Sequence, residues 1–133
     1  MRRLVLDPSL CTGCLSCVTH CSGKHEGHYH PLSSRRRVEI EPFTGENRHF
    51  YCRQCDSPSC AAACPEGAIE RNEVTGAWVI DYGKCTGCLA CVEACPFSAI
   101  FRDPVSGRVI KCDLCGGEPE CALVCKLGAL TFK

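Results

Sequence analysis

The sequence predicts an α+β fold in which short helices alternate with β-hairpins. Its 133 residues include sixteen cysteines, which fall into four groups of four. In every group the third and fourth cysteines are four residues apart, which is about one turn of an α-helix. Between the groups, short apolar runs flank turns that contain glycine, as in a β-hairpin.

The predicted elements recur with a period of 31 residues. Pro65 matches Pro96 and Gly76 matches Gly107, which indicates one supersecondary unit written more than once. The prolines end a short helix, because proline lacks the backbone N–H that a helix needs. The glycines can adopt a positive φ and so permit a tight turn.

Each expected hairpin pairs two apolar runs: 37–40 with 48–51, 68–70 with 78–80, and 99–101 with 109–110. The expected helices lie between the third and fourth cysteines of the groups. Segment 22–37 has no clear periodicity, and we expect it to be a surface loop.

The composition leaves little material for a conventional hydrophobic core. Apart from cysteine, the large side chains include one Trp, one Met, five Phe and three Tyr. A chain this short needs covalent or metal cross-links, so its cysteines form either disulfides or metal sites. The apolar stretch 4–6 is too short for a signal peptide, and no segment approaches the roughly 20 apolar residues of a membrane helix. We therefore expect a cytoplasmic chain without direct membrane insertion, whose reduced thiols bind metal.

The spacing of the cysteines favours iron–sulfur clusters. Each group opens with C-x-x-C and closes with C-x-x-x-C, and the third group reads C-x2-C-x2-C-x3-C-P, the bacterial run that holds a [4Fe–4S] cluster. The candidate ligands are Cys11, Cys14, Cys17, Cys21, Cys52, Cys55, Cys60, Cys64, Cys85, Cys88, Cys91, Cys95, Cys112, Cys115, Cys121 and Cys125. They supply the thiolates for four [4Fe–4S] clusters with none left over, which predicts a protein that conducts electrons.

Two alternatives use the same residues. Structural zinc also binds C-x-x-C pairs, but it has no use for a third cysteine three residues further on. A disulfide framework would require a secreted protein. Both are less favoured than iron and sulfide.

The formal net charge of zero changes once clusters are counted. An oxidised cluster with four thiolates carries about −2, so four clusters would bring roughly −8. An acidic protein of this kind is not expected to bind nucleic acid.

A few other residues could have special roles. His25, His28 and His30 form either a metal site or a loop without a redox role. The run from 35 to 37 is all arginine and either docks an acidic partner, offsets cluster charge or is a solvated stretch at a strand start. Trp78 is expected to pack in the core or an interface. No nucleotide-binding or Ser/His/Asp motif is present, so the protein is not expected to be an enzyme.

The four groups in this order resemble the four-cluster, ferredoxin-like electron-transfer subunits of multi-subunit oxidoreductases. That family serves dimethyl sulfoxide reductase, formate dehydrogenase, formate hydrogenlyase, carbon monoxide dehydrogenase and tungsten aldehyde oxidoreductase systems. The resemblance implies tandem, interlocked, bacterial-type two-cluster ferredoxin-like halves, covering 1–51 plus 108–133 and 52–107.

The resemblance also implies an exchanged fourth ligand. The implied ligand sets are Cys11, Cys14, Cys17 and Cys125; Cys112, Cys115, Cys121 and Cys21; Cys52, Cys55, Cys60 and Cys95; and Cys85, Cys88, Cys91 and Cys64. Cys21 and Cys125 lack the following proline, and the gaps within the second and fourth groups are longer than in the third. These departures leave the choice of partner open.

The resemblance implies a non-catalytic subunit that passes electrons between a large catalytic subunit and a ferredoxin or flavoprotein. Among catalytic partners we expect a molybdenum- or tungsten-pterin enzyme such as aldehyde oxidoreductase. A free-standing polyferredoxin, or the iron–sulfur subunit of a hydrogenase, formate dehydrogenase or carbon monoxide dehydrogenase, is the alternative. A zinc-binding interaction module is a more remote one. Head-to-tail stacking of the subunit into filaments is a further expectation.

Overall fold

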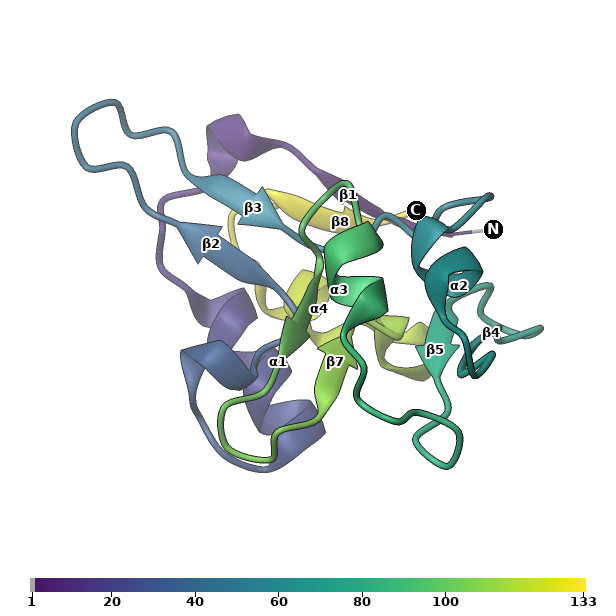
Figure 1. The fold of residues 1–133 in the computed structure, drawn as a ribbon. Helices are drawn as coiled ribbons and strands as arrows, with labels where there is room; N and C mark the ends of the chain where they lie inside the picture. The colour runs from purple at the N-terminus through teal and green to yellow at the C-terminus, as the bar shows by residue number, and fades with distance from the viewer. Residues whose placement is uncertain (1) are drawn as a thin grey trace.

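The computed structural model describes residues 2–133 and has the predicted α+β class, with short helices and antiparallel strand pairs (Figure 1). The helices are α1 (Ser16–Glu26), α2 (Ser59–Ala63), α3 (Ala90–Ala94) and α4 (Glu120–Val124). The strands are β1 (Leu4–Leu6), β2 (Arg37–Glu39), β3 (Arg48–Phe50), β4 (Ile69–Arg71), β5 (Trp78–Ile80), β6 (Ile100–Arg102), β7 (Val109–Lys111) and β8 (Leu130–Phe132). Short 3-10 turns cover Pro8–Leu10, Pro31–Ser33 and Leu114–Gly117.

The three predicted hairpins are confirmed. β2 pairs with β3, β4 with β5 and β6 with β7, each in antiparallel register. Gly76 and Gly107 both have a φ of 75°, the conformation that the tight turns require. At the start of the matching turns, Asn72 and Asp103 each accept a backbone N–H from the residue two positions on. The 31-residue repeat therefore includes the residues that form the turns as well as the cysteines.

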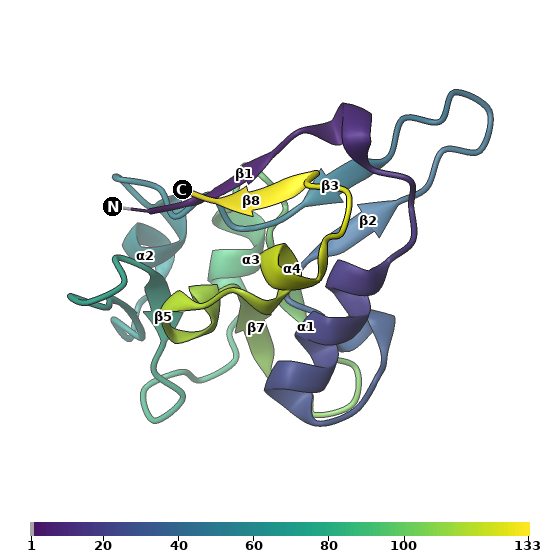
Figure 2. The same ribbon diagram turned by 180° about the vertical axis from the view of Figure 1, so that it is seen from behind.

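A fourth strand pair, which the sequence did not predict, joins the two ends of the polypeptide. β1 pairs with β8 in antiparallel register, with Val5 opposite Thr131. Figure 2 shows the two strands side by side, with the N- and C-termini next to each other. This pairing brings the first cysteine group near the last.

The helices pack in two pairs that also join distant parts of the sequence. α1 packs against α4, and α2 packs against α3. Two small clusters of buried side chains lie beneath them. One contains Leu114 and Leu130, and the other contains Ile100 and Val109. Cysteines belong to both clusters, so candidate metal ligands are part of the core.

The expectation of a surface loop over 22–37 is wrong in two respects. Helix α1 continues to Glu26, and Ser22, Ser33 and Ser34 are fully buried. All three hydroxyls have partners: Ser22 Oγ donates to the carbonyl of Thr19, Ser33 Oγ donates to Asp103 Oδ1 at 2.6 Å, and Ser34 Oγ accepts from the N–H of Arg36. The lack of periodicity suggested an exposed loop, whereas these small hydroxyls are buried with partners.

Within residues 2–133, no helix is both long and apolar enough to span a lipid bilayer.

The buried carboxylate of Asp103 connects the 22–37 segment to the β6–β7 turn. It accepts from Ser33, from Ser106 and from the N–H of Val105. Burial opposes ionisation, but these donors outweigh it and lower the pKa of Asp103 from 3.8 to about 2. The ionised form thus contributes stability that is present above pH 3.8 and is lost as the pH falls towards 2.

We predict that Asp103→Ala lowers the free energy of unfolding by about 2–3 kcal/mol, because buried hydroxyl and N–H donors lose their acceptor. The matched variant Asn72→Ala removes only the equivalent turn contacts, which are near the surface, and should cost about 1 kcal/mol. Guanidinium unfolding followed by circular dichroism under anaerobic conditions measures both. Equal losses in the two variants would contradict the connecting role of Asp103.

Candidate metal centres

Three cavities within residues 2–133 are each lined by four cysteines. We call them site 1, lined by Cys11, Cys14, Cys17 and Cys125; site 3, lined by Cys52, Cys55, Cys60 and Cys95; and site 4, lined by Cys64, Cys85, Cys88 and Cys91. Each of these linings combines three cysteines of one group with the last cysteine of another. All sixteen thiols are free of disulfides.

The four cysteines that line none of these cavities are Cys21, Cys112, Cys115 and Cys121, which we call site 2. His25 lies among them, with Nδ1 3.8 Å from Cys21 Sγ and Nε2 3.8 Å from Cys115 Sγ. Site 2 is therefore occupied in part by a side chain where the other sites are hollow.

The helix pairs explain how the cysteines meet. The third cysteine of each group lies in a helix, and the fourth lies in the same helix or directly after it. Because α1 packs against α4, the end of α4 brings Cys125 to site 1, and α1 carries Cys21 to site 2. The α2–α3 pair places Cys64 and Cys95 at sites 4 and 3 in the same way.

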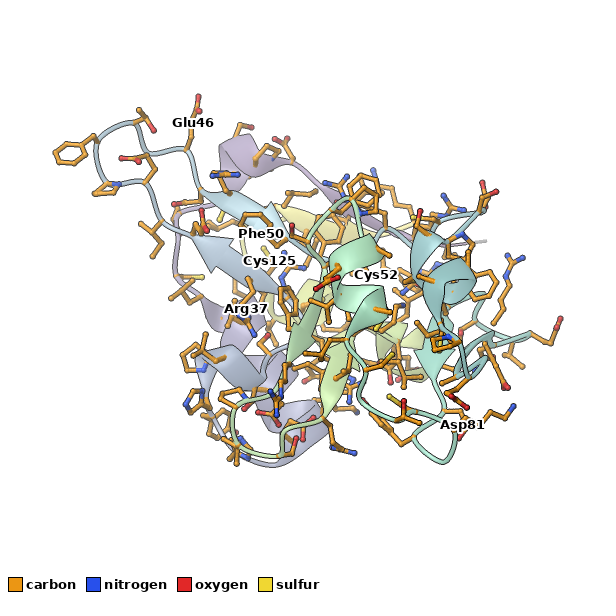
Figure 3. All side chains as sticks on the ribbon, in the orientation of Figure 1. Arg37, Glu46, Phe50, Cys52, Asp81 and Cys125 are labelled. Atoms are coloured by element: carbon orange, nitrogen blue, oxygen red, sulfur yellow. The ribbon has the colours of Figure 1, made fainter. Side chains whose placement is uncertain are left out.

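Figure 3 shows where these side chains lie. Cys52 and Cys125 lie near the middle of the view, whereas Glu46 projects on the loop between β2 and β3. Phe43 on that loop is 94% exposed. The projecting loop contributes none of the cysteines.

The loops that carry the first cysteines expose backbone N–H groups. Gly13 and Gly87, in the two Cys-Thr-Gly-Cys segments, have φ values of 79° and 77°. Leu15 and Leu89, two residues later, also have positive φ, so the two loops share one conformation. Five further N–H groups already point at cysteine sulfur, at 3.2–3.5 Å: those of Arg35, Gln54, Ala68, Ala99 and Leu114. Such donors favour the thiolate over the thiol.

Burial of the third cysteine of each group has the opposite effect, because it favours the thiol over the thiolate. It raises the pKa of Cys17, Cys60 and Cys91 above 9.0, and it raises the pKa of Cys121 to about 11. Soft cations reverse this preference, because a coordinating thiol is deprotonated by the metal. Four converging sulfurs around a hollow therefore fit a metal–sulfide group, which supplies both the missing volume and the missing positive charge.

Arg36 lines site 1 and is only 2% exposed. Its Nη2 donates to His49 Nδ1 at 2.8 Å, but Nε and Nη1 have no hydrogen-bond partner among residues 2–133. Burial, followed by the charge of Arg36, lowers the pKa of His49 to about 4, so His49 is a neutral acceptor. Buried N–H donors without partners are costly, which indicates that site 1 normally holds an acceptor.

Arg35 is also buried, with 9% of its surface exposed. Its Nη1 donates to the carbonyl of Lys111 at 3.2 Å, and its guanidinium lies 3.6 Å from carboxylate oxygens of Glu26 and Asp113. Of the three alternatives for the arginine run, the solvated stretch is wrong for Arg35 and Arg36. Arg35 contacts buried partners, and Arg36 lines site 1.

The three histidines do not gather into one metal site. His25 Nε2 lies 2.8 Å from Asp113 Oδ1, and these two groups with Cys115 form the one compact cluster of three potential metal ligands found within residues 2–133. Burial lowers the pKa of His25, but hydrogen bonds to Asp113, Cys115 and Cys21 outweigh it and raise the pKa to about 12. His28 and His30 instead contact nearby residues of their own loop.

Two functional candidates were missed by reasoning from the sequence. Lys111 is 1% exposed, lines site 3 and donates from Nζ to the carbonyls of Trp78 and Cys112. Its place directly after the apolar run 109–110 was the available signal. Asn47 Nδ2 donates to the carbonyl of Cys11 at 3.3 Å, and nothing in the sequence marked it.

Trp78 packs against the buried cluster that contains Ile100 and Val109, and its Nε1 donates to the carbonyl of Cys55. Its expected packing role is confirmed.

Comparison with known proteins gives a family match. Residues 47–133 match the model of a 4Fe-4S dicluster domain. Over 92% of its length this protein is 44% identical to the aliphatic sulfonate oxidoreductase polyferredoxin-like subunit of Pyrococcus furiosus, of which it covers 70%. It is 35% identical to the NADH-dependent phenylglyoxylate dehydrogenase subunit beta of Aromatoleum evansii, where it covers 96% of its own length and 29% of the relative.

One further relative and one solved structure extend the comparison. A subunit of the anaerobic dimethyl sulfoxide reductase of Escherichia coli is 33% identical over 96% of this protein and 70% of the relative. A polypeptide of the active-site complex BamBC of benzoyl coenzyme A reductase superposes with a TM-score of 0.60 at 28% identity, covering all of this protein and 76% of the other.

Proposed function

Because this protein belongs to the 4Fe-4S dicluster family of iron–sulfur electron-transfer subunits, we propose that it relays electrons through four [4Fe–4S] clusters between a separate catalytic subunit and a ferredoxin or flavoprotein. The sixteen cysteines fit four such clusters. The observation that carries the proposal is the lining of sites 1, 3 and 4, each with four cysteine sulfurs around a hollow. A bound [4Fe–4S] cluster takes up and releases one electron at a time.

The four-cysteine linings also support exchanged ligands. We assign one cluster to each of sites 1–4, so that every cluster takes three cysteines from one group and one from another. Sites 1 and 2 then belong to a half formed by 1–51 plus 108–133, and sites 3 and 4 belong to a half formed by 52–107. The packing of α1 on α4 and of α2 on α3 supports this division into interlocked halves.

The protein's own groups would bind the clusters, shield them from water and tune their reduction potentials. The thiolates hold iron, the helices bury the third cysteine of each group partly or fully, and backbone N–H groups donate to the sulfurs. Cys14 and Cys88 are exposed, so sites 1 and 4 reach the surface where electrons can enter and leave. Every cysteine is used as a cluster ligand, and we assign no catalytic role to any side chain.

For the catalytic partner we propose a molybdenum- or tungsten-pterin oxidoreductase, such as an aldehyde oxidoreductase. Support comes from relatives that are themselves named as parts of an aliphatic sulfonate oxidoreductase and a dimethyl sulfoxide reductase. Sixteen free thiols also require a reducing compartment, for which we propose the cytoplasm.

Anaerobic purification should yield a brown protein with about sixteen irons and a similar amount of sulfide per polypeptide, because four clusters hold four irons each. Dithionite should bleach its visible absorbance. Metal and sulfide analysis together with absorption spectroscopy check this. A colourless protein with zinc in place of iron would contradict the proposal and favour a zinc-binding module instead.

Paired substitutions test the exchanged ligands. Cys52→Ala/Cys95→Ala removes two ligands of site 3 and should destroy one cluster, leaving sites 1, 2 and 4 intact. Cys52→Ala/Cys64→Ala removes two cysteines of one sequence group and should damage both site 3 and site 4. Mössbauer spectroscopy counts the intact [4Fe–4S] clusters. The reverse outcome would show that each group holds its own cluster.

A catalytic subunit that contains molybdenum or tungsten should co-purify with an affinity-tagged copy of the protein from its native cells under anaerobic conditions. The contacts of such an interface must hold two redox proteins in a fixed orientation, so the complex should survive gel filtration. Mass spectrometry and metal analysis identify the partner, with a tagged two-cluster ferredoxin as the control. Elution as an iron-loaded monomer would favour a free-standing polyferredoxin.

A further inference from the structure

Two buried cations lie beside the cysteine sites and are not neutralised by carboxylates. Arg36, 2% exposed, lines site 1 and keeps Nε and Nη1 without partners among residues 2–133. Its hydrogen bond goes to a neutral histidine, and its guanidinium stacks 5.2 Å from the ring of Tyr51. None of the ion pairs found in the described residues includes Arg36. Among the described residues, its charge therefore has no carboxylate partner beside site 1, and two of its donors are unpaired.

Lys111 is the buried cation beside site 3, as Arg36 is beside site 1. It is 1% exposed and lines the cavity of Cys52, Cys55, Cys60 and Cys95. Two of the three ammonium donors are used by the carbonyls of Trp78 and Cys112, and neither acceptor carries a full charge. The ammonium is thus held by dipoles next to four sulfurs, and the third donor remains for the occupant of the cavity.

Site 4 has no such cation. Apart from the cysteines, the ionisable side chain among the described residues that line it is the carboxylate of Glu66. Lys84 precedes Cys85, but its side chain is about half exposed and pairs with Glu70. Water screens an exposed ion pair of this kind strongly.

Sites 1 and 4 are otherwise closely matched. Both contain a Cys-Thr-Gly-Cys loop with closely similar positive φ values, and in both the second cysteine of that loop is exposed. Loop conformation and solvent access, two of the factors that set cluster potentials, are therefore similar. The sites differ in the buried charge of Arg36 at site 1, and in the Glu66 carboxylate and the Ala68 N–H donor at site 4.

Reduction adds one negative charge to a cluster that is already about −2 with its thiolates. A buried cation stabilises the more negative state, and it does so strongly where water is excluded. We propose that Arg36 and Lys111 raise the reduction potentials of the clusters in sites 1 and 3, which leaves the cluster of site 4 more reducing than those two. This inference rests on the proposed function.

Single ligand removals test the order of the potentials. Cys14→Ala and Cys88→Ala remove equivalent exposed ligands from site 1 and site 4. The iron-loaded proteins are titrated with redox mediators and followed by electron paramagnetic resonance. We expect the step that Cys88→Ala abolishes to lie at a more negative potential than the step that Cys14→Ala abolishes. Loss in Cys14→Ala of a step more negative than the one lost in Cys88→Ala would overturn the proposal.

Removing the charges of Arg36 and Lys111 tests whether these cations raise the reduction potentials. Arg36→Gln and Lys111→Gln keep a hydrogen-bond donor and remove the charge. Each should lower the equilibrium constant for reduction of at least one cluster at least tenfold, which is about 59 mV for a one-electron couple. Arg36→Lys should restore most of the shift, and Lys84→Gln, which removes an exposed cation, should leave all potentials unchanged. Unchanged potentials in both glutamine variants with full iron content would overturn the proposal.

The outcomes distinguish a failure of the proposed function from a failure of the charge effect. Far fewer than about sixteen irons in the unmodified protein would be a failure of the proposed function. Full iron content with the wrong order of potentials would be a failure of the charge effect alone. If Arg36→Gln does not assemble its clusters, Lys111→Gln and the comparison of Cys14→Ala with Cys88→Ala still decide the question.

Discussion

The structure depends on bringing cysteines from distant parts of the sequence together, twelve of them around three hollows. The third cysteine of every group is in a helix and is partly or fully buried, and burial disfavours its thiolate. The apolar clusters between the sites are small and include cysteines as members. A protein of this size gains little from such a core. Iron and sulfide would supply both the packing volume and the positive charge, so metal binding and folding should be one process.

The same constraint explains the topology. A four-sulfur site built from one group would leave each segment free of the others, whereas sites 1, 3 and 4 each take a cysteine from a second group. The β1–β8 pair and the α1–α4 contact join the two ends of the polypeptide, and the α2–α3 contact closes the middle. Loss of one site should therefore be felt in two segments that are far apart in sequence.

Local features were predictable from the sequence, and long-range features were not. The hairpins followed from apolar runs around turn glycines, and the short helices followed from cysteine spacing and proline. Strand β1 was missed because three apolar residues have no local signal and their partner lies at the other end of the sequence. The burial of Ser33 and Arg36 was missed because it comes from Asp103 and from site 1, contacts that composition does not reveal.

The central claim is that each site holds an iron–sulfur cube bound by cysteines of two groups. Crystals of the anaerobically prepared protein, measured on both sides of the iron absorption edge, test it most directly. The account predicts four compact peaks of anomalous iron density, in sites 1, 3 and 4 and among the cysteines of site 2. Single zinc peaks, or iron bound by the four cysteines of one sequence group, would contradict it.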